Sequence, residues 1–134
     1  MATMTQFTHA QNKKLAHSLA ALEKQLRDDI RAALLQTGDE HHAELAGTVH
    51  DLGDESVADL LTELGTALHE RHLRELTEIQ AARGRLARGD IGHCPDCGGD
   101  ISYKRLMAYP LAVRCVACQS LHEKTYAHEA SPRM

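Results

Sequence analysis

Apolar residues recur at helical spacing in two long segments that precede the cysteines. In the first segment they are mostly three or four positions apart, at Leu15, Leu19, Leu22, Leu26, Ile30, Ala33 and Leu34. The second segment repeats this spacing, with polar interruptions, at Val57, Leu61, Leu64, Leu68, His72, Glu75 or Leu76, Ile79, Ala82 and Leu86. Steps of three and four place side chains on one face of a helix. The pattern therefore predicts two long helices, each with one apolar stripe.

The two stripes predict an antiparallel helical hairpin. Each stripe is wide enough to bury against one partner, and the sequence between them is short, so the simplest arrangement pairs the two helices with each other. We expect the turn between Gly47 and Gly53. With about 35 residues in each helix, a rise of about 1.5 Å per residue gives a rod on the order of 50 Å long.

Charge is distributed unevenly along this hairpin. No Lys or Arg occurs in the 39 residues from 32 to 70, and all 15 basic residues lie outside that window. The window contains the acidic residues Asp39, Glu40, Glu44, Asp51, Asp54, Glu55, Asp59, Glu63 and Glu70. Like charges repel one another and cost stability, so an acidic tip of this kind indicates a function. The alternative is a solvated helix end in which Asp51 or Asp54 serves as an N-cap.

Four cysteines carry the strongest chemical signal. Cys94 and Cys97 form one CxxC pair, Cys115 and Cys118 form the other, and 17 residues separate the pairs. This spacing is typical of a tetrahedral four-thiolate zinc site, and the glycines at 92, 98 and 99 suit the tight turns of such a site. Because four thiolates fill the tetrahedron, we expect one structural zinc rather than a catalytic one.

Two other interpretations of the cysteines are a pair of disulfides and a redox dithiol. Disulfides would imply export, but the N-terminus shows no signal peptide, so we expect a reducing cytoplasm. A thioredoxin-like dithiol needs a CxxC in a βαβ setting, and the sequence predicts no such strands. Zinc is the better prediction.

Composition narrows the class of protein. The 134 residues include one Phe, three Tyr and no Trp, too few aromatic residues for a large globular core. No run approaches the roughly 18 apolar residues of a membrane span, so we expect no membrane association. A net charge of −4 argues weakly against a general nucleic-acid binder. The sequence contains no triad order, phosphate loop or HExxH motif that predicts an enzyme.

Ten histidines are scattered along the chain. His41, His42 and His50 flank the acidic tip, where we expect exposed polar side chains rather than a metal site. His69 and His72 fall near the apolar stripe of the second helix, and we expect them to pack there.

The stretch from Gly89 to Gln119 resembles the zinc-finger signature of the DksA/TraR family. The matching positions are Ile91, Gly92, Cys94, Cys97, Gly98, Ile101, Arg105, Leu106, Ala108, Pro110, Ala112, Cys115, Cys118 and Gln119. With the helical hairpin, the resemblance covers the chain from about residue 10 to about residue 127.

The resemblance implies a bacterial transcription factor that binds RNA polymerase rather than DNA. Members of the family insert a coiled coil into the secondary channel of the polymerase, so that the acidic tip approaches the active centre, and the larger members act with ppGpp at promoters. For this chain the resemblance implies a cytoplasmic monomer with one zinc ion and no sequence-specific DNA binding. A channel leading to a magnesium centre should accept an acidic tip readily.

The family's tip pattern, Asp-x-x-Asp-x-Ala, falls here on Asp51, Asp54 and Ser56. Both aspartates match, and we expect both to be exposed. Ser56 replaces the alanine and adds a hydroxyl group, so the resemblance implies a protein that occupies the channel with a weaker or altered effect. Arg105 is a candidate contact to polymerase or ppGpp.

These observations predict a mostly α protein with an N-terminal segment at 1–9 and an antiparallel coiled-coil hairpin at 10–88, whose acidic tip lies near 47–56. A four-cysteine zinc-finger base follows at 89–134, with a zinc ribbon and a C-terminal helix on Ser120 to Glu129. Two rival functions remain. One is a redox-sensing zinc switch. The other is a nucleic-acid-binding zinc ribbon with a basic patch of Arg83, Arg85, Arg88, Lys104, Arg105 and Arg114.

Overall fold

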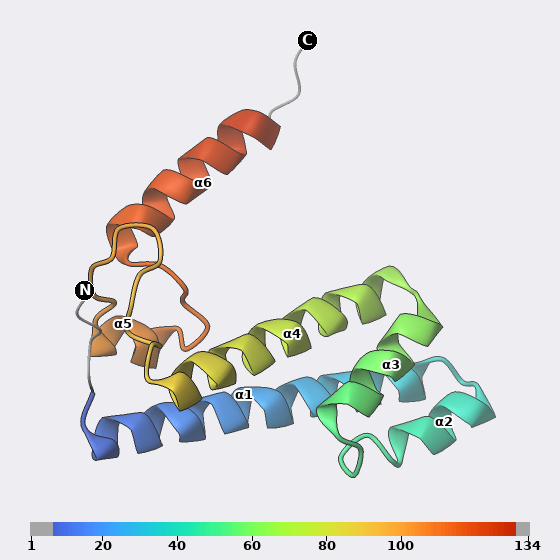
Figure 1. Ribbon diagram of the computed structural model, residues 1–134. Coiled ribbons are helices and arrows are strands. Elements are labelled where there is room, and N and C mark those ends of the chain that lie inside the picture. The colour runs from blue at the N-terminus through green and yellow to red at the C-terminus, as the bar shows by residue number, and fades with distance from the viewer. Residues whose placement is uncertain (1–6, 131–134) are drawn as a thin grey trace. The chain divides into compact units, whose positions relative to one another are not determined.

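The computed structural model describes residues 7–130, with side chains as far as Thr125. Its helices are α1 (His9–Gln36), α2 (Glu40–Ala46), α3 (Asp54–Leu64), α4 (Ala67–Arg88), α5 (Tyr103–Ala108) and α6 (Val116–Ala130) (Figure 1). Within the described range, β-structure is limited to an isolated bridge between His93 and Asp100. The predicted mostly α class is confirmed. Among the helices of this range, none has the length and apolar character needed to cross a membrane.

The chain divides into two compact units. One, the helical unit, contains residues 17–81, and the other, the zinc unit, combines residues 1–16 with residues 82–134. The chain passes between them inside α1 and again inside α4, since both helices continue across the boundaries.

The helical unit buries most of the two predicted stripes, although Leu68 of the second stripe is 41% exposed. In this unit α1 and α4 run side by side in opposite directions (Figure 1), as predicted for a hairpin. Its buried apolar residues come from α1, α2, α3, α4 and the connection after α2: Leu19, Leu26, Ile30, Leu34, Ala46, Val49, Val57, Leu60, Leu61, Leu76 and Ile79. Burial of such side chains, at about 25 cal/mol per Å² of apolar surface, stabilises the pairing.

Both long helices are shorter than the roughly 35 residues expected from the stripe. The first, α1, has 28 residues and ends before Gly38, which has a φ of 75°. Asp39 then caps α2 by accepting hydrogen bonds from the N–H groups of His41 and His42. The second arm is interrupted by Gly65 between α3 and α4, with a φ of 62°. A glycine in the left-handed region ends a helix, so the predicted pair of continuous helices is wrong at this end.

The acidic connection between α2 and α3 occupies residues 47–53, where the turn of the hairpin was predicted. It lies against α1, where Arg27 donates to Leu52 O and His50 pairs with Asp28, because α2 folds back along α1, so it is not the far end of the hairpin (Figure 1). It carries Asp51 and leads into Asp54, the first residue of α3. The N-cap position of α3 is occupied by Gly53, whose backbone is extended, so neither aspartate is the predicted N-cap.

The histidines of α4 are interior residues, as predicted. His69 is 4% and His72 is 2% exposed, and their ring centroids lie 6.2 Å apart. Among the residues that the structure describes, neither Nδ1 atom has a hydrogen-bond partner. Near the tip His41 and His50 are exposed, whereas His42 is half-buried with its Nδ1 2.9 Å from Thr37 Oγ1.

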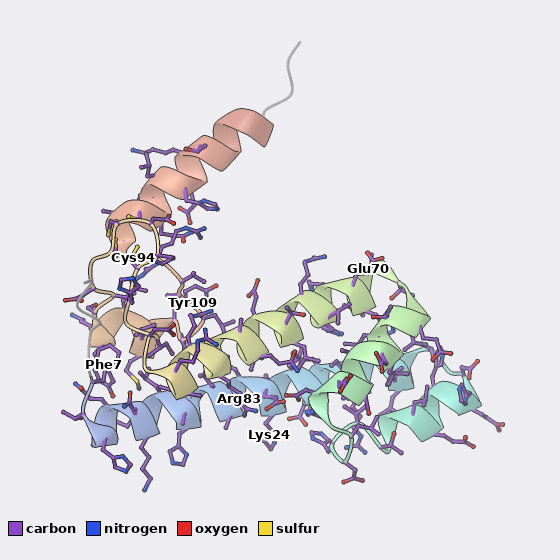
Figure 2. The ribbon with its side chains drawn as sticks, in the orientation of Figure 1. Phe7, Lys24, Glu70, Arg83, Cys94 and Tyr109 are labelled. Carbon is purple, nitrogen blue, oxygen red and sulfur yellow. The ribbon has the colours of Figure 1, made fainter. Side chains whose placement is uncertain are left out.

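The zinc unit has a small core of its own. Its buried apolar side chains include Leu15, Ala82, Ile91, Ile101, Leu106 and Ala112. The Phe7 ring, labelled in Figure 2, packs edge to face against the Tyr103 ring, with 5.7 Å between the ring centroids. The C-terminal helix begins at Val116, four residues before the predicted start at Ser120, and therefore includes Cys118. The first six residues of the predicted N-terminal segment lie outside the described range.

Candidate metal centre

The first cysteine pair lies on a tight turn that follows α4. Cys94 N donates to Gly99 O at 2.9 Å, and Gly98 N donates back to Cys94 O at 2.9 Å. Gly98 has a φ of 73°, a conformation that side chains disfavour. Gly99 N donates to Cys97 Sγ at 3.4 Å, and a Cβ at Gly99 would lie only 3.3 Å from that sulfur. Glycine is therefore favoured at 98 by its φ, and a side chain at 99 would press against the Cys97 sulfur.

The second pair lies where the chain enters α6. Cys115 immediately precedes α6 and Cys118 is in its first turn, so the helix fixes their spacing. Gln119 N donates to Cys115 O at 2.9 Å, which begins the helical hydrogen bonds. Each pair is thus held by its own local backbone structure.

Two arginines connect the two cysteine turns. Arg105, in α5, donates from Nε to Arg114 O at 3.0 Å, and Arg114 donates from Nε to Asp96 Oδ2 at 2.7 Å. Asp96 lies between the first two cysteines. Arg105 is half-buried, and its Nε group is hydrogen-bonded within the zinc unit. The predicted contact of Arg105 with polymerase or ppGpp stays a prediction.

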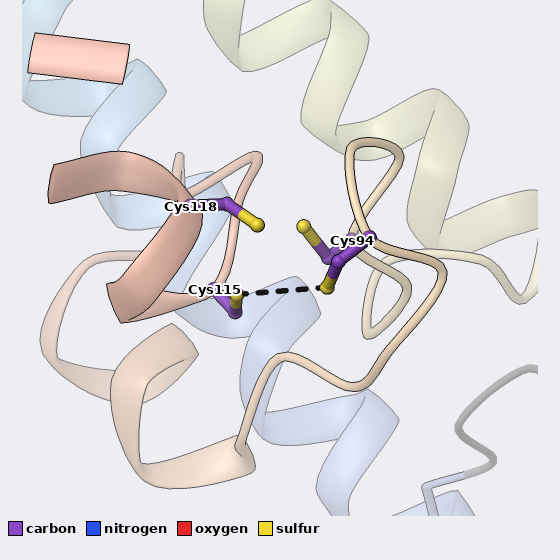
Figure 3. Close-up of side chains that lie close together, drawn as sticks. Cys94, Cys115 and Cys118 are labelled. Carbon is purple, nitrogen blue, oxygen red and sulfur yellow. Dashed lines mark hydrogen bonds between the residues drawn. The ribbon is translucent and has the colours of Figure 1, made fainter. Parts of the chain in front are cut away.

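The four sulfur atoms converge on one point. All four Sγ atoms lie within 4.8 Å of one another, and the Cys97 and Cys115 sulfurs are 3.8 Å apart. Figure 3 shows the side chains of Cys94, Cys115 and Cys118 directed toward one another. A tetrahedron with Zn–S bonds of about 2.3 Å has edges of about 3.8 Å. The donor set therefore fits a single structural zinc and leaves no position for a substrate.

The surroundings of Cys94 and Cys118 shift the pKa of these two thiols in opposite directions. Burial opposes ionisation of Cys94, but backbone hydrogen bonds from Cys115, Cys97 and Asp96 prevail and lower its pKa to about 6. Hydrogen bonds with Cys115 and Cys97, together with burial, raise the pKa of Cys118. One thiol is thus ready to lose its proton while another retains it. A divalent cation that displaces all four protons would bind more tightly as the pH rises.

The tip residues have unequal surroundings. Asp51 and Ser56 are exposed, whereas Asp54 is half-buried. The Asp54 carboxylate lies 2.6 Å from the guanidinium of Arg27, on α1. The expectation that both aspartates are exposed is therefore wrong for Asp54.

Sequence reasoning missed Arg27 because the apolar stripe gave no reason to single it out. A usable signal was present: Glu23 and Arg27 are four residues apart and flank the stripe position Leu26. Two oppositely charged side chains at this spacing lie on one face of the helix, so beside a buried stripe they can be buried as a pair.

Two of the six residues of the rival basic patch pair with carboxylates of the zinc unit. Arg88 Nε lies 3.5 Å from Asp90 Oδ2, and Arg114 is bound to Asp96. Burial lowers the pKa of Arg85, which is half-buried. A phosphate-binding surface needs exposed cations, so these pairings weigh against the nucleic-acid interpretation.

Comparison with known proteins gives a consistent result. Residues 89–124 match the family model described as the prokaryotic dksA/traR C4-type zinc finger. The chain is 28% identical over 113 residues to the RNA polymerase-binding transcription factor DksA of Escherichia coli strain K12, covering 82% of this chain and 72% of the relative. The Salmonella typhimurium protein of the same name is 27% identical over 114 residues, covering 85% and 72%.

Two further similarities extend over most of the matched proteins. An uncharacterised 8.2 kDa protein of Escherichia phage P2 is 36% identical over 70 residues, which are 52% of this chain and 86% of the relative. The solved structure of transcription factor DksA2 from Pseudomonas aeruginosa is 28% identical, with a TM-score of 0.45, and the match covers 87% of this chain and 98% of that one. From the zinc-finger match, the DksA relatives that match most of the chain and the 36% identity to the phage protein, we conclude that the chain belongs to the DksA/TraR family.

Proposed function

We propose that this protein is a transcription regulator that binds RNA polymerase through the secondary channel and modulates initiation together with ppGpp. The observation that carries the proposal is the acidic stretch of the helical unit, residues 32–70, which contains no Lys or Arg and includes the exposed Asp51, in a protein with this family's zinc finger. The relatives that cover most of this chain are named RNA polymerase-binding transcription factors. The protein acts by binding, as a cytoplasmic monomer, and not as an enzyme.

The charge of the hairpin supports this function. Asp51, Glu55 and Asp59 are exposed, and the sequence supplies no cation between residues 32 and 70. A negative potential at the tip favours entry into a channel lined by basic side chains and leading to magnesium ions. Ser56, exposed where the family pattern has alanine, modifies the contact made there. The four cysteines hold the zinc and keep the base folded, and they take no part in the contact at the tip.

The test is a pair of measurements on the same preparations. Competition binding to the cognate polymerase reports occupancy, and the decay of open complexes at a ribosomal promoter, with and without ppGpp, reports the effect. We expect wild-type protein to shorten the lifetime of open complexes. Asp51→Asn should still compete for polymerase while losing most of this effect, because the substitution removes an exposed charge and leaves the fold unchanged.

Asp59→Asn is the matched control, since it makes the same change at another exposed acidic position, outside the tip pattern. It should retain the effect of wild type. Equal loss in both variants would show that only the total charge matters, and an unchanged lifetime with wild type at saturating binding would refute the proposed function. A salt-dependent shift of DNA by the protein alone would support the nucleic-acid alternative.

The redox alternative stays a prediction that the same protein can test. Cys97 is exposed and the four thiols are close enough to form disulfides after zinc loss. Release of zinc by peroxide at low micromolar concentration would support it, and retention of zinc would argue against it.

A further inference from the structure

Arg27 is a buried cation at the acidic connection. It lies on α1, is 9% exposed, and directs its guanidinium away from its own helix toward residues 49–54. Nη1 donates to the backbone carbonyls of Val49 and, at 2.7 Å, Leu52. Nη2 lies 2.6 Å from Asp54 Oδ1 and 3.5 Å from Glu23 Oε1. One side chain therefore contacts the connection at two carbonyls and the start of α3 at Asp54.

These contacts replace backbone pairing that the connection lacks. The amides of residues 48, 51 and 52 are satisfied by nearby carbonyls, at Leu45 and Thr48. The carbonyls of Val49 and Leu52 face Arg27 instead. Because a buried carbonyl needs a donor, the conformation of this segment depends on the guanidinium.

Asp54 belongs to the same cluster. Hydrogen bonds with Glu23, then Arg27, and with Gln80 lower the pKa of Asp54, against the opposing effect of burial. Its carboxylate is therefore ionised and already occupied by partners within the protein. Asp51 has its backbone N–H bonded to Thr48 O at 2.9 Å, and its side chain is exposed.

We propose that Arg27 is a positioning residue of the tip: it fixes residues 49–54 and engages the Asp54 carboxylate, so that Asp51 is the aspartate of the pair presented to a partner. This inference rests on the proposed function for its consequence in transcription. The two aspartates of the pattern then have different roles, since Asp54 holds the segment through Arg27 and Asp51 supplies the free charge. Charge-assisted hydrogen bonds of this kind are about twice as strong as neutral ones, so their loss should be measurable locally.

The structural test is amide hydrogen exchange on the zinc-loaded full-length protein. Arg27→Gln should accelerate exchange of the amides at residues 48–55 by at least about tenfold, which corresponds to about 1.4 kcal/mol, while the amides of α4 remain protected. Arg31→Gln is the matched control, because Arg31 lies one turn further along α1 and is exposed. It should leave the exchange rates unchanged. Equal exchange in wild type and Arg27→Gln would overturn the proposal.

If Arg27→Gln fails to fold, two further variants test whether Asp54 helps to hold the connection. Asp54→Asn removes one of the three contacts and should accelerate exchange in the same segment, whereas Asp51→Asn should not. Equal effects of these two substitutions would overturn the proposal, since they would show that Asp54 is no more tightly held than Asp51.

The functional test uses open-complex decay at saturating binding. If Asp54 acts through Arg27, the double variant Arg27→Gln/Asp54→Asn should lose no more activity than the stronger single variant, while adding Asp51→Asn to either should cause a further loss. Full additivity of Arg27→Gln and Asp54→Asn would overturn the coupling. If wild type itself has no effect on open complexes, the proposed function fails, and hydrogen exchange alone then decides whether Arg27 holds the segment.

Discussion

Asp51 and Asp54 are three positions apart and carry the same charge, yet their neighbours give them different properties. Asp51 projects from the acidic connection into solvent, whereas Asp54 begins α3 and meets the guanidinium of Arg27. Replacing a solvent-exposed carboxylate by an amide should change the free energy of unfolding little. Replacing a carboxylate that pairs with a buried cation should lower it more, because the buried cation is left without a counter-charge.

We predict that Asp51→Asn and Asp54→Asn differ in stability. Asp51→Asn should change the free energy of unfolding by no more than about 0.5 kcal/mol, as is usual for an exposed site. Asp54→Asn should cost about 1–3 kcal/mol, because a hydrogen bond to a charged, buried group is lost. Urea unfolding followed by circular dichroism measures both values. Identical midpoints would contradict the role given to Arg27.

At the scale of elements, the sequence predicts which faces of the helices are buried but misses where the helices end. The positions from Leu15 to Leu34 pack as their spacing requires. Gly38 and Gly65 interrupt the arms although apolar residues continue beyond them, because a left-handed glycine stops a helix whatever stripe follows. Cysteine spacing was enough to predict the zinc centre, since its ligands come from two local turns.

The contacts of Arg27 lay beyond sequence reasoning for a different reason. They join α1 to backbone carbonyls 22 and 25 residues away. Every residue has such a carbonyl, so the sequence does not show which ones will accept a hydrogen bond from a side chain. Only the path of the connection shows that Val49 and Leu52 need donors. The same holds for the hydrogen bond from Arg105 to Arg114 O, because its acceptor is also a backbone carbonyl.

Two glycine substitutions should have opposite effects. Gly65→Ala forces a side chain into a left-handed conformation and should lower the free energy of unfolding by about 1–2 kcal/mol. Gly84→Ala lies within α4, where alanine favours the helix, and should stabilise by about 0.5–1 kcal/mol if the Arg88 side chain moves aside. Thermal unfolding of both variants checks the signs. Stabilisation by Gly65→Ala would mean that α3 and α4 prefer to be continuous.

The buried histidines should make the helical unit sensitive to acid. Burial lowers the pKa of His69, helped by His72 and His42. Burial also lowers the pKa of His72, with Glu75 and Asp29 opposing the shift and Arg71 adding to it. The unfolded chain therefore binds protons more readily than the folded one. Stability should be complete above the unfolded pKa of about 6.5 and should decline as the pH falls below it.

The double variant His69→Gln/His72→Gln tests this dependence. Its melting temperature should fall less than that of wild type between pH 7.5 and pH 5.5, even if the variant is less stable throughout. His41→Gln, at an exposed position of α2, should keep the dependence of wild type. An equal decline in the double variant and wild type would assign the acid sensitivity to other groups.

At the scale of the whole molecule, zinc and apolar packing stabilise different units. The zinc unit has a small core around Ile91, Ile101 and Leu106, so metal binding should supply much of its folding free energy. Cys94→Ser, or a strong chelator, should abolish the near-ultraviolet signal of Tyr103 and Tyr109 while most helical dichroism remains. Zinc content by mass spectrometry provides the second measurement. A thermal transition unchanged by chelation would contradict this prediction.

The passage of the chain between the two units has a practical consequence. Both crossings, at residues 16–17 and 81–82, fall inside helices α1 and α4 and not in a linker. A protease needs an extended segment in its cleft, and a hydrogen-bonded helix does not offer one. Limited digestion should therefore spare both crossings and cut first near residues 37–39, where α1 has ended and the backbone is exposed. An expression fragment that stops at either crossing would leave a helix severed within its length.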